Sequence, residues 1–216
     1  MLRKVHGVGV SPFVRKVRVA LAEKGLDYEL EPVFPFGVSA EFKKISPLGK
    51  IPVLQEDDYY LPDSSAILDY LEVSYPSPSL YPKDPRDRGR AVFLEEYADG
   101  GISTKATVAI FFQRLVGPRF MGQPTDETVV QKAIDEDVPP MLDYLESLLA
   151  GGQQFLVGGE LSVADIAVTT QFVNLAHAQY TVDEKRWPNL AAYLDRMMAR
   201  PSFASLMAEE RAMFDA

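Results

Sequence analysis

The sequence predicts a protein of two parts, in which a small mixed α/β domain is followed by a domain made only of helices. Short strand and helix patterns alternate through about the first third of the sequence. The proline-rich stretch "YPSPSLYPKDPRD" then interrupts both patterns, and the long segments beyond it carry apolar residues at helical spacing. We expect the α/β domain at residues 1–76, a stiff linker at 77–86 and an all-helical domain at 87–216.

The α/β domain should begin with one strand and one helix. Lys4 to Val10 has the pattern of a strand. The helix is expected from Pro12 to Lys24, because apolar residues recur there at helical spacing, and Gly25 stands where a C-cap glycine belongs.

A second strand follows in "LDYELEPV", and then a short helix from Ala40 to Ile45 with Ser39 as its cap. "IPVLQ" and "YYLP" read as two strands joined by the acidic turn Glu56-Asp57-Asp58. "DSSAILDYLEVSY" returns to the helical period. The order βαβαββα predicts a right-handed parallel crossover and a closing hairpin, and therefore a mixed sheet.

The second domain should be a bundle of amphipathic helices. The expected helices span residues 86–120, 126–149, 162–180, 190–200 and a last segment after Pro201. Gly100-Gly101 would kink the first of them. Ser162 and Asp165 have the spacing of a capping box, which we interpret as folding architecture.

Composition excludes several classes of function. With 22 Lys+Arg against 31 Asp+Glu, the net charge of -9 argues against nucleic acid as the main partner. The sequence has no cysteine, so disulfides, thiolate metal sites and a cysteine nucleophile are excluded. His6 and His177 share no acidic spacing that indicates a metal site. Without a signal peptide or a long apolar run, we expect a cytoplasmic protein that does not insert into a membrane.

The Ser11-Pro12 pair offers the first chemical clue. It fits the N-cap and first position of a helix, and that structural role alone accounts for it. The hydroxyl could also donate a hydrogen bond where the helix N-terminus already favours an anion. A bond to a charged group contributes about 1.5–3 kcal/mol, which would lower a bound thiol's pKa by about 1–2 units.

Pro52, in the strand "IPVLQ", is the second clue, because strand interiors rarely tolerate proline. A cis Ile51-Pro52 bond would turn the backbone N–H and C=O of Ile51 outward, where an extended peptide could pair with them. The alternative is a trans proline at an edge or at the first residue of a strand.

The third clue is "PDSSAIL". Ser64 is expected at the N-cap of a helix, where N–H groups and a hydroxyl suit a carboxylate, while Asp63 suits an ammonium group. An α-amino acid head group carries both charges side by side. A helix cap without a ligand is the alternative.

Taken in order, these motifs resemble the cytosolic glutathione transferase family. "SPFVRKVRVALAEKGLDYE", "SPLGKIPVL" and "DSSAILDYLE" resemble its thioredoxin-like glutathione site, while "GGELSVADIAV" and "WPNLAAYLDRMMARPSF" are similar to its helical domain. The resemblance covers both domains and is to the bacterial, serine-type (theta-like or nu-like) classes. It implies a thioredoxin-like domain followed by a helical bundle, with glutathione as a substrate and no metal.

The resemblance also implies roles for single residues. Ser11 is similar to the catalytic serine that donates to the glutathione thiolate, and Phe13 belongs to the same glutathione-binding set. Ile51 would pair its backbone with the cysteinyl part, ahead of the family's cis-proline at Pro52. Lys50 lies where several classes bind the glycyl carboxylate, although a solvated turn lysine is an equal alternative.

Asp63 and Ser64 match the γ-glutamyl-binding pair of the family, with Asp where Glu or Gln is commoner. The second, electrophilic substrate should lie beside the thiol between the domains, where pockets commonly form. Its expected contacts are Thr104, Val108, Phe111 and Phe112, whose spacing also fits plain core burial.

Departures from the family pattern narrow the expectation. The sequence has no cysteine near residue 11, no tyrosine in the first strand and no "SSC" stretch of the kind expected in a maleylacetoacetate isomerase. We therefore expect a homodimeric, detoxifying enzyme that activates glutathione for attack on a small hydrophobic electrophile, a peroxide or a disulfide. The alternative is a non-catalytic module of the same fold in a translation or transcription complex.

Overall fold

The computed structural model describes the backbone of residues 2–215 and the side chains of residues 2–214, which form two compact units. One unit contains the residues up to Tyr81 together with those from Pro201 onward, and the other runs from Pro82 to Arg200. This division differs from the expected one at the end of the sequence, because the last helix, α10 (Pro201–Asp215), belongs with the α/β unit.

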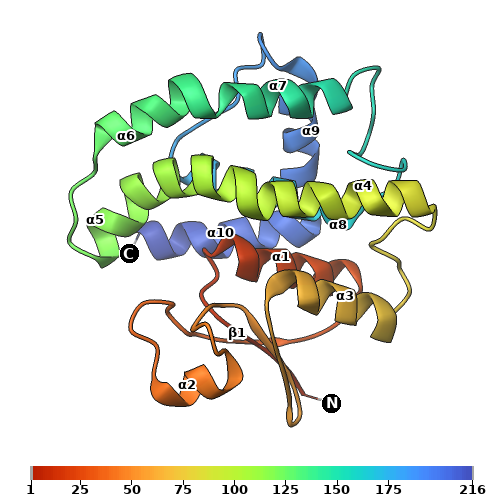
Figure 1. Cartoon of the computed structure of the whole chain (residues 1–216), viewed down its shortest axis with the longest axis vertical. Helices are drawn as coiled ribbons and strands as arrows, with labels where there is room; N and C mark the ends of the chain where they lie inside the picture. Colours follow the sequence, from red (N-terminus) through yellow and green to blue (C-terminus); the bar gives the residue numbers. More distant parts are fainter. Residues whose placement is uncertain (1, 216) are drawn as a thin grey trace. The chain divides into compact units, whose positions relative to one another are not determined.

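One buried ion pair and one partly exposed pair explain the place of α10, which packs on α1 (Pro12–Glu23) (Figure 1). Arg15 and Glu210 are both 0% exposed, and Arg15 Nε donates to Glu210 Oε1 at 2.8 Å. Arg18 bonds Glu209 with a shortest N–O distance of 2.6 Å. Removing one partner of a buried pair costs about 3–5 kcal/mol, so the Arg15–Glu210 pair ties the last helix to the first. Glu209 is 46% exposed, so its pair with Arg18 adds less.

The α/β unit has a four-stranded mixed sheet in the order β2-β1-β3-β4. Its strands are β1 (Arg3–His6), β2 (Glu29–Glu31), β3 (Val53–Glu56) and β4 (Tyr59–Pro62). β1 is parallel to β2 and antiparallel to β3, and β3 is antiparallel to β4, as the element order predicts. The first strand ends at His6 rather than Val10, because the backbone then turns and Ser11 N–H donates to the Val8 carbonyl at 3.1 Å.

Three helices pack with this sheet: α1, α2 (Ala40–Ile45) and α3 (Ser64–Ser74). α1 contacts α3, and Figure 1 shows these two together on one side of the sheet with α2 apart from them. The prediction for α2 is confirmed, including its cap, since Ser39 Oγ accepts the Phe42 N–H at 3.1 Å. Gly25, at φ 66°, ends α1 as expected, because glycine alone adopts this conformation without steric cost.

The acidic turn of the hairpin is shorter than predicted. β3 ends with Glu56, so only Asp57 and Asp58 lie between the strands. Glu56 is 3% exposed and accepts hydrogen bonds from Arg3 Nε at 2.8 Å, from the Tyr75 hydroxyl at 2.9 Å and from the Tyr70 hydroxyl. Burial opposes ionisation, but these three donors outweigh it and lower the pKa of the Glu56 carboxyl.

The second unit is helical, as predicted. Its helices are α4 (Pro85–Glu96), η1 (Tyr97–Val116), α5 (Gly117–Phe120), α6 (Glu127–Lys132), η2 (Ala133–Asp137), α7 (Pro139–Leu148), α8 (Val163–His177) and α9 (Pro188–Met198). The first long helix widens to π winding at Tyr97, before Gly100-Gly101, and continues through both glycines. The second is divided at Val138, because two prolines follow and supply no N–H to an α-helical ladder.

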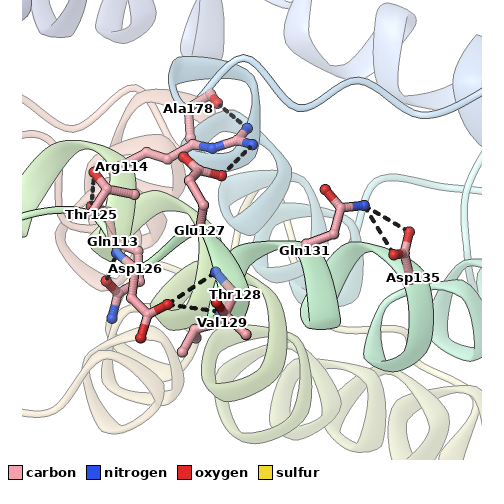
Figure 2. Close-up of polar contacts among 10 residues, drawn as sticks. All are labelled: Gln113, Arg114, Thr125, Asp126, Glu127, Thr128, Val129, Gln131, Asp135 and Ala178. Carbon is pink, nitrogen blue, oxygen red and sulfur yellow. Dashed lines mark hydrogen bonds and ion pairs between the residues drawn. The ribbon is translucent and has the colours of Figure 1, made fainter.

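Figure 2 shows how the start of α6 is tied to η1. Gln113 accepts from the Thr125 hydroxyl through its backbone carbonyl at 3.0 Å and from the Asp126 N–H through its side-chain oxygen at 3.2 Å. Asp126 in turn caps α6, accepting from the N–H groups of Thr128 and Val129. Arg114, also on η1, donates to the Ala178 carbonyl at 3.2 Å.

Asp165 holds the start of α8 in the core of this unit. Its carboxylate accepts from Ser162 N–H at 2.9 Å and from Ser162 Oγ at 3.0 Å, which confirms the predicted contact between the two residues. It also accepts from Leu156 N–H and from the Tyr193 hydroxyl, each at 2.9 Å. Complete burial still raises the pKa of the Asp165 carboxyl, despite these bonds.

Candidate functional site

Ser11 stands at the N-cap of α1 in an extended conformation, followed by Pro12 at the first helical position. Its hydroxyl oxygen accepts the Val14 N–H at 3.5 Å, which is a long hydrogen bond. Among the groups that the structure describes, the hydroxyl proton has no acceptor, and the Ser11 side chain is half-buried. The cap therefore leaves one donor at a helix N-terminus, where an anion is stabilised.

The Ile51-Pro52 peptide bond is cis, as expected. Ile51 is only 8% exposed, so its side chain belongs to the core. Its backbone N–H and C=O form no hydrogen bond with any described residue. These two groups are the pair that an extended peptide would need.

The start of α3 corrects one prediction. Asp63, not Ser64, is the N-cap: its Oδ1 accepts from Ser65 N–H at 3.0 Å and from Ala66 N–H at 3.1 Å. Asp63 has φ 81° and ψ 127°, which lies outside the left-handed helical region that Asp and Asn tolerate, so its backbone is strained. Ser64 is 4% exposed, and neither its N–H nor its hydroxyl bonds another described residue.

The corrected cap is compatible with the roles expected of the two residues. Because Asp63 occupies the next two N–H groups, the donors left for a carboxylate are the N–H and hydroxyl of Ser64. The second carboxylate oxygen of Asp63 accepts nothing from the described residues and lies on an exposed side chain, so it can accept from an ammonium group.

Several contacts bring the three motifs into one region of the α/β unit. Asp63 N–H donates to the Pro52 carbonyl at 3.3 Å, which joins the start of α3 to the proline. A Cβ added at Gly7 would lie 2.5 Å from Val14 Cγ2 and 3.4 Å from Ile51 Cβ, so α1 and the Ile51 segment both pack against the end of β1. The sheet thus places a hydroxyl, a peptide edge and a charged helix start near one another.

Two other predicted residues have more peripheral positions. Phe13 is half-buried in the first turn of α1, next but one to Ser11 in sequence. Lys50 is exposed, but its backbone N–H and C=O are both held by Ser46 Oγ, at 3.1 and 2.7 Å. Its side chain therefore extends from a well-defined turn.

The candidate contacts for a second substrate all lie on η1 in the helical unit. Thr104 and Val108 are exposed, Val108 at 51%, while Phe112 is half-buried. Phe111 is 5% exposed and belongs to the core, so plain burial accounts for it. A cavity of about 480 Å³ in the same unit lies elsewhere, against α4, α7 and residues 150–158, and contains none of the predicted residues.

Sequence reasoning missed two polar residues of the α/β unit. Lys16 is 0% exposed and donates to Ser65 Oγ at 3.1 Å, joining α1 to α3. Ser46 is 1% exposed and holds the backbone of Lys50. The signal for Ser46 was its place directly before Pro47 at the end of a predicted helix, but its partner follows four residues later in an irregular turn.

Two further kinds of feature are missing from residues 2–215. None of the helices in this range is long and apolar enough to cross a membrane. Among the side chains that the structure describes, no group of three or more histidine or acidic residues is arranged to hold a metal ion.

Comparison with known proteins identifies the architecture. Residues 5–79 match the family model for the N-terminal domain of glutathione S-transferase, and residues 115–210 match that for its C-terminal domain. The protein is also 30% identical over 193 residues to the maleylacetoacetate isomerase of Rattus norvegicus, covering 87% of this sequence and 84% of the isomerase. The chain belongs to the glutathione S-transferase family. It is thus a transferase of this type, and the comparisons give the non-catalytic module no better support.

Other members resemble it along most of its length. A glutathione S-transferase of Triticum aestivum is 29% identical over 210 residues, covering 96% of this sequence and 93% of that protein. The solved glutathione S-transferase of Rhodospirillum rubrum is 30% identical with a TM-score of 0.88, covering 95% of this sequence and 91% of that one. The glutathione S-transferase of Methylobacterium radiotolerans, solved in complex with glutathione sulfonate, is 32% identical with a TM-score of 0.76. The match covers 96% of this sequence and 95% of that protein. The predicted fold class, thioredoxin-like domain then helical domain, is confirmed.

Proposed function

We propose that this glutathione S-transferase binds glutathione on its α/β unit and uses Ser11 to hold the bound thiol as a thiolate. One observation carries the proposal: Ser11 presents a hydroxyl donor at a helix N-terminus, with no acceptor among the described residues. A thiolate there accepts a hydrogen bond and is further stabilised by the helix dipole.

The rest of the tripeptide is bound by the neighbouring groups. The cysteinyl N–H and C=O pair with the backbone of Ile51, whose own groups are unoccupied by described residues. The α-carboxylate of the γ-glutamyl group accepts from Ser64, and its ammonium donates to Asp63. Lys50 pairs with the glycyl carboxylate, and Phe13 borders the same site. The solved relative with bound glutathione sulfonate supports this choice of ligand.

The reaction follows from an ionised thiol. The thiol loses its proton to solvent, and the sulfur then attacks an electrophilic carbon, forming an S–C bond as the leaving group departs with its electron pair. Attack on a peroxide or disulfide uses the same nucleophile. Thr104, Val108 and Phe112 stay the proposed contacts for the second substrate, since their side chains reach the surface, whereas Phe111 does not.

A role in detoxification, a homodimeric state and a cytoplasmic location complete the proposal, which family membership supports. Twofold association is the commonest form of oligomer among soluble proteins. Sedimentation at micromolar concentration tests the dimer, and a monomer there would contradict it.

The direct test is isothermal titration of the protein with glutathione, followed by a substrate panel. We expect heat of binding at millimolar ligand or below, and glutathione-dependent turnover of a chlorinated aromatic electrophile, a peroxide or a disulfide. Maleylacetoacetate joins the panel because an isomerase is among the relatives. Absence of both binding and stabilisation at millimolar glutathione would contradict the proposal.

A further inference from the structure

We propose that Ser46 is a positioning residue of the glutathione site, which fixes the turn that presents the backbone of Ile51 to the ligand. The inference rests on the proposed function and adds a residue that does not itself touch the substrate. Ser46 is the C-cap of α2 and is 1% exposed.

The hydroxyl of Ser46 closes a tight turn. The hydroxyl oxygen accepts the Lys50 N–H at 3.1 Å, and the O–H donates to the Lys50 carbonyl at 2.7 Å, so one side chain satisfies both backbone groups of that residue. The Ser46 carbonyl also accepts the Gly49 N–H at 2.8 Å. Gly49 has φ 65°, which favours glycine, and together these features define the path of residues 46–50.

The hydrogen bonds along the segment isolate Ile51. Lys50 is satisfied on both sides by Ser46. Pro52 has no N–H, and its carbonyl accepts the Asp63 N–H at 3.3 Å. Between them, Ile51 alone keeps an N–H and a C=O that no described residue occupies.

This pattern gives Ser46 a specific effect on binding. Without its hydroxyl, the two backbone groups of Lys50 lose their partner, and the segment relaxes toward conformations in which Ile51 is no longer aligned for pairing. The loss should weaken glutathione binding while leaving Ser11, on a different helix, to act on whatever thiol is bound. KM for glutathione should therefore rise, and kcat at saturation should stay near that of the wild type.

The matched control is Ser39, the serine at the other end of the same helix, which accepts the Phe42 N–H at 3.1 Å. We expect Ser46→Ala to raise the Kd and KM for glutathione about five- to tenfold, the equivalent of one net hydrogen bond. Ser39→Ala should leave both constants unchanged. Ser46→Asn should restore binding, because its amide can both donate and accept.

A ligand variant separates this role from general destabilisation. Glutathione methylated on the cysteinyl nitrogen cannot donate to the Ile51 carbonyl. We expect Ser46→Ala to weaken glutathione binding much more than binding of the methylated analogue, measured by titration at a temperature where melting curves show both variants folded.

The inference is overturned if Ser46→Ala binds glutathione like Ser39→Ala, if it weakens both ligands by the same factor, or if Ser46→Asn fails to restore binding while folded. These outcomes leave the proposed function intact. If the wild type itself binds neither ligand, the proposed function is overturned as well.

Discussion

Ser11 and Ser162 each open a helix, α1 and α8, but their hydroxyl groups are used differently. Ser162 is 2% exposed, and its hydroxyl donates to Asp165 at 3.0 Å. Ser11 is half-buried, accepts one long hydrogen bond and has no described acceptor for its proton. Both serines occupy the N-cap of a helix. The hydroxyl donor of Ser162 is used by a protein group, whereas that of Ser11 is left for a ligand.

The difference separates the structural role of an N-cap serine, which is to accept a backbone N–H, from a functional role, which needs a free hydroxyl donor. Capping preference explains both serines equally, because it concerns only the oxygen as an acceptor. What distinguishes Ser11 is that its hydroxyl proton has no acceptor among the described residues, whereas that of Ser162 is donated to Asp165. We therefore expect changes at the α8 cap to alter stability, and changes at Ser11 to alter chemistry.

The largest expected effect is that of Asp165→Ala. The substitution removes the acceptor for four hydrogen bonds in the core, and each buried donor left unpaired costs about 1–3 kcal/mol. We expect a loss of more than about 3 kcal/mol in the free energy of unfolding, measured with urea. Asp126→Ala, which removes an exposed cap of α6, should cost about 1 kcal/mol. Equal losses in the two variants would show that burial adds nothing at Asp165.

Ser11→Ala should have the largest effect on chemistry. Losing a hydrogen bond to a thiolate, about 1.5–3 kcal/mol, should reduce kcat/KM at neutral pH by about 10- to 100-fold. The pKa of the bound glutathione thiol should rise by about 1–2 units, measured from the pH dependence of the rate or from thiolate absorbance. An unchanged rate and pH profile with the chlorinated aromatic substrate would reject the role of Ser11.

Ser162→Ala should act on stability alone. The general scale for N-caps predicts a loss of about 1 kcal/mol. The melting temperature should fall by a few degrees, while kcat and KM of the folded enzyme stay unchanged. An unaltered melting temperature would refute the assignment of Ser162 as a structural cap.

The smallest effect concerns pH and contrasts two buried carboxylates. The pKa of Asp165 is raised by burial, whereas hydrogen bonds to Glu56 lower its pKa below the ordinary value of about 4.5. The folded protein therefore binds the Glu56 proton more weakly than the unfolded protein does, so this contribution is present above pH 4.5 and is lost as the pH falls through the folded pKa. Glu56→Gln should make the acid-induced loss of stability shallower in urea titrations below that pH. An identical slope would contradict this.

Local rules in the sequence predicted most of the fold. Two of its features depend on residues close in sequence: helix α2 with its cap at Ser39, and the glycine end of α1. The mixed sheet follows from the order of the elements. The chemical motifs were found in the same way, because cap serines and a strand proline have short signatures. The cis form of the Ile51-Pro52 bond agrees with the prediction.

Features that depend on distant or competing partners were not predicted. Three adjacent residues, Asp63, Ser64 and Ser65, could each cap α3, and only the three-dimensional path of the backbone selects Asp63. The sequence pattern predicts Glu56 in the turn between the two strands, but Arg3 and two tyrosines hold it in the core. The assignment of α10 depends on a pair between residues 15 and 210, which no local pattern reveals.

That last pair bears on the order in which the molecule can be made. Arg15 emerges from the ribosome long before its partner Glu210. During synthesis, the Arg15 charge on α1 therefore has no ion-pair partner at position 210 until nearly all of the sequence has been translated. A nascent polypeptide arrested at residue 200 therefore holds an incomplete first unit, however much of the later helical unit it has already folded.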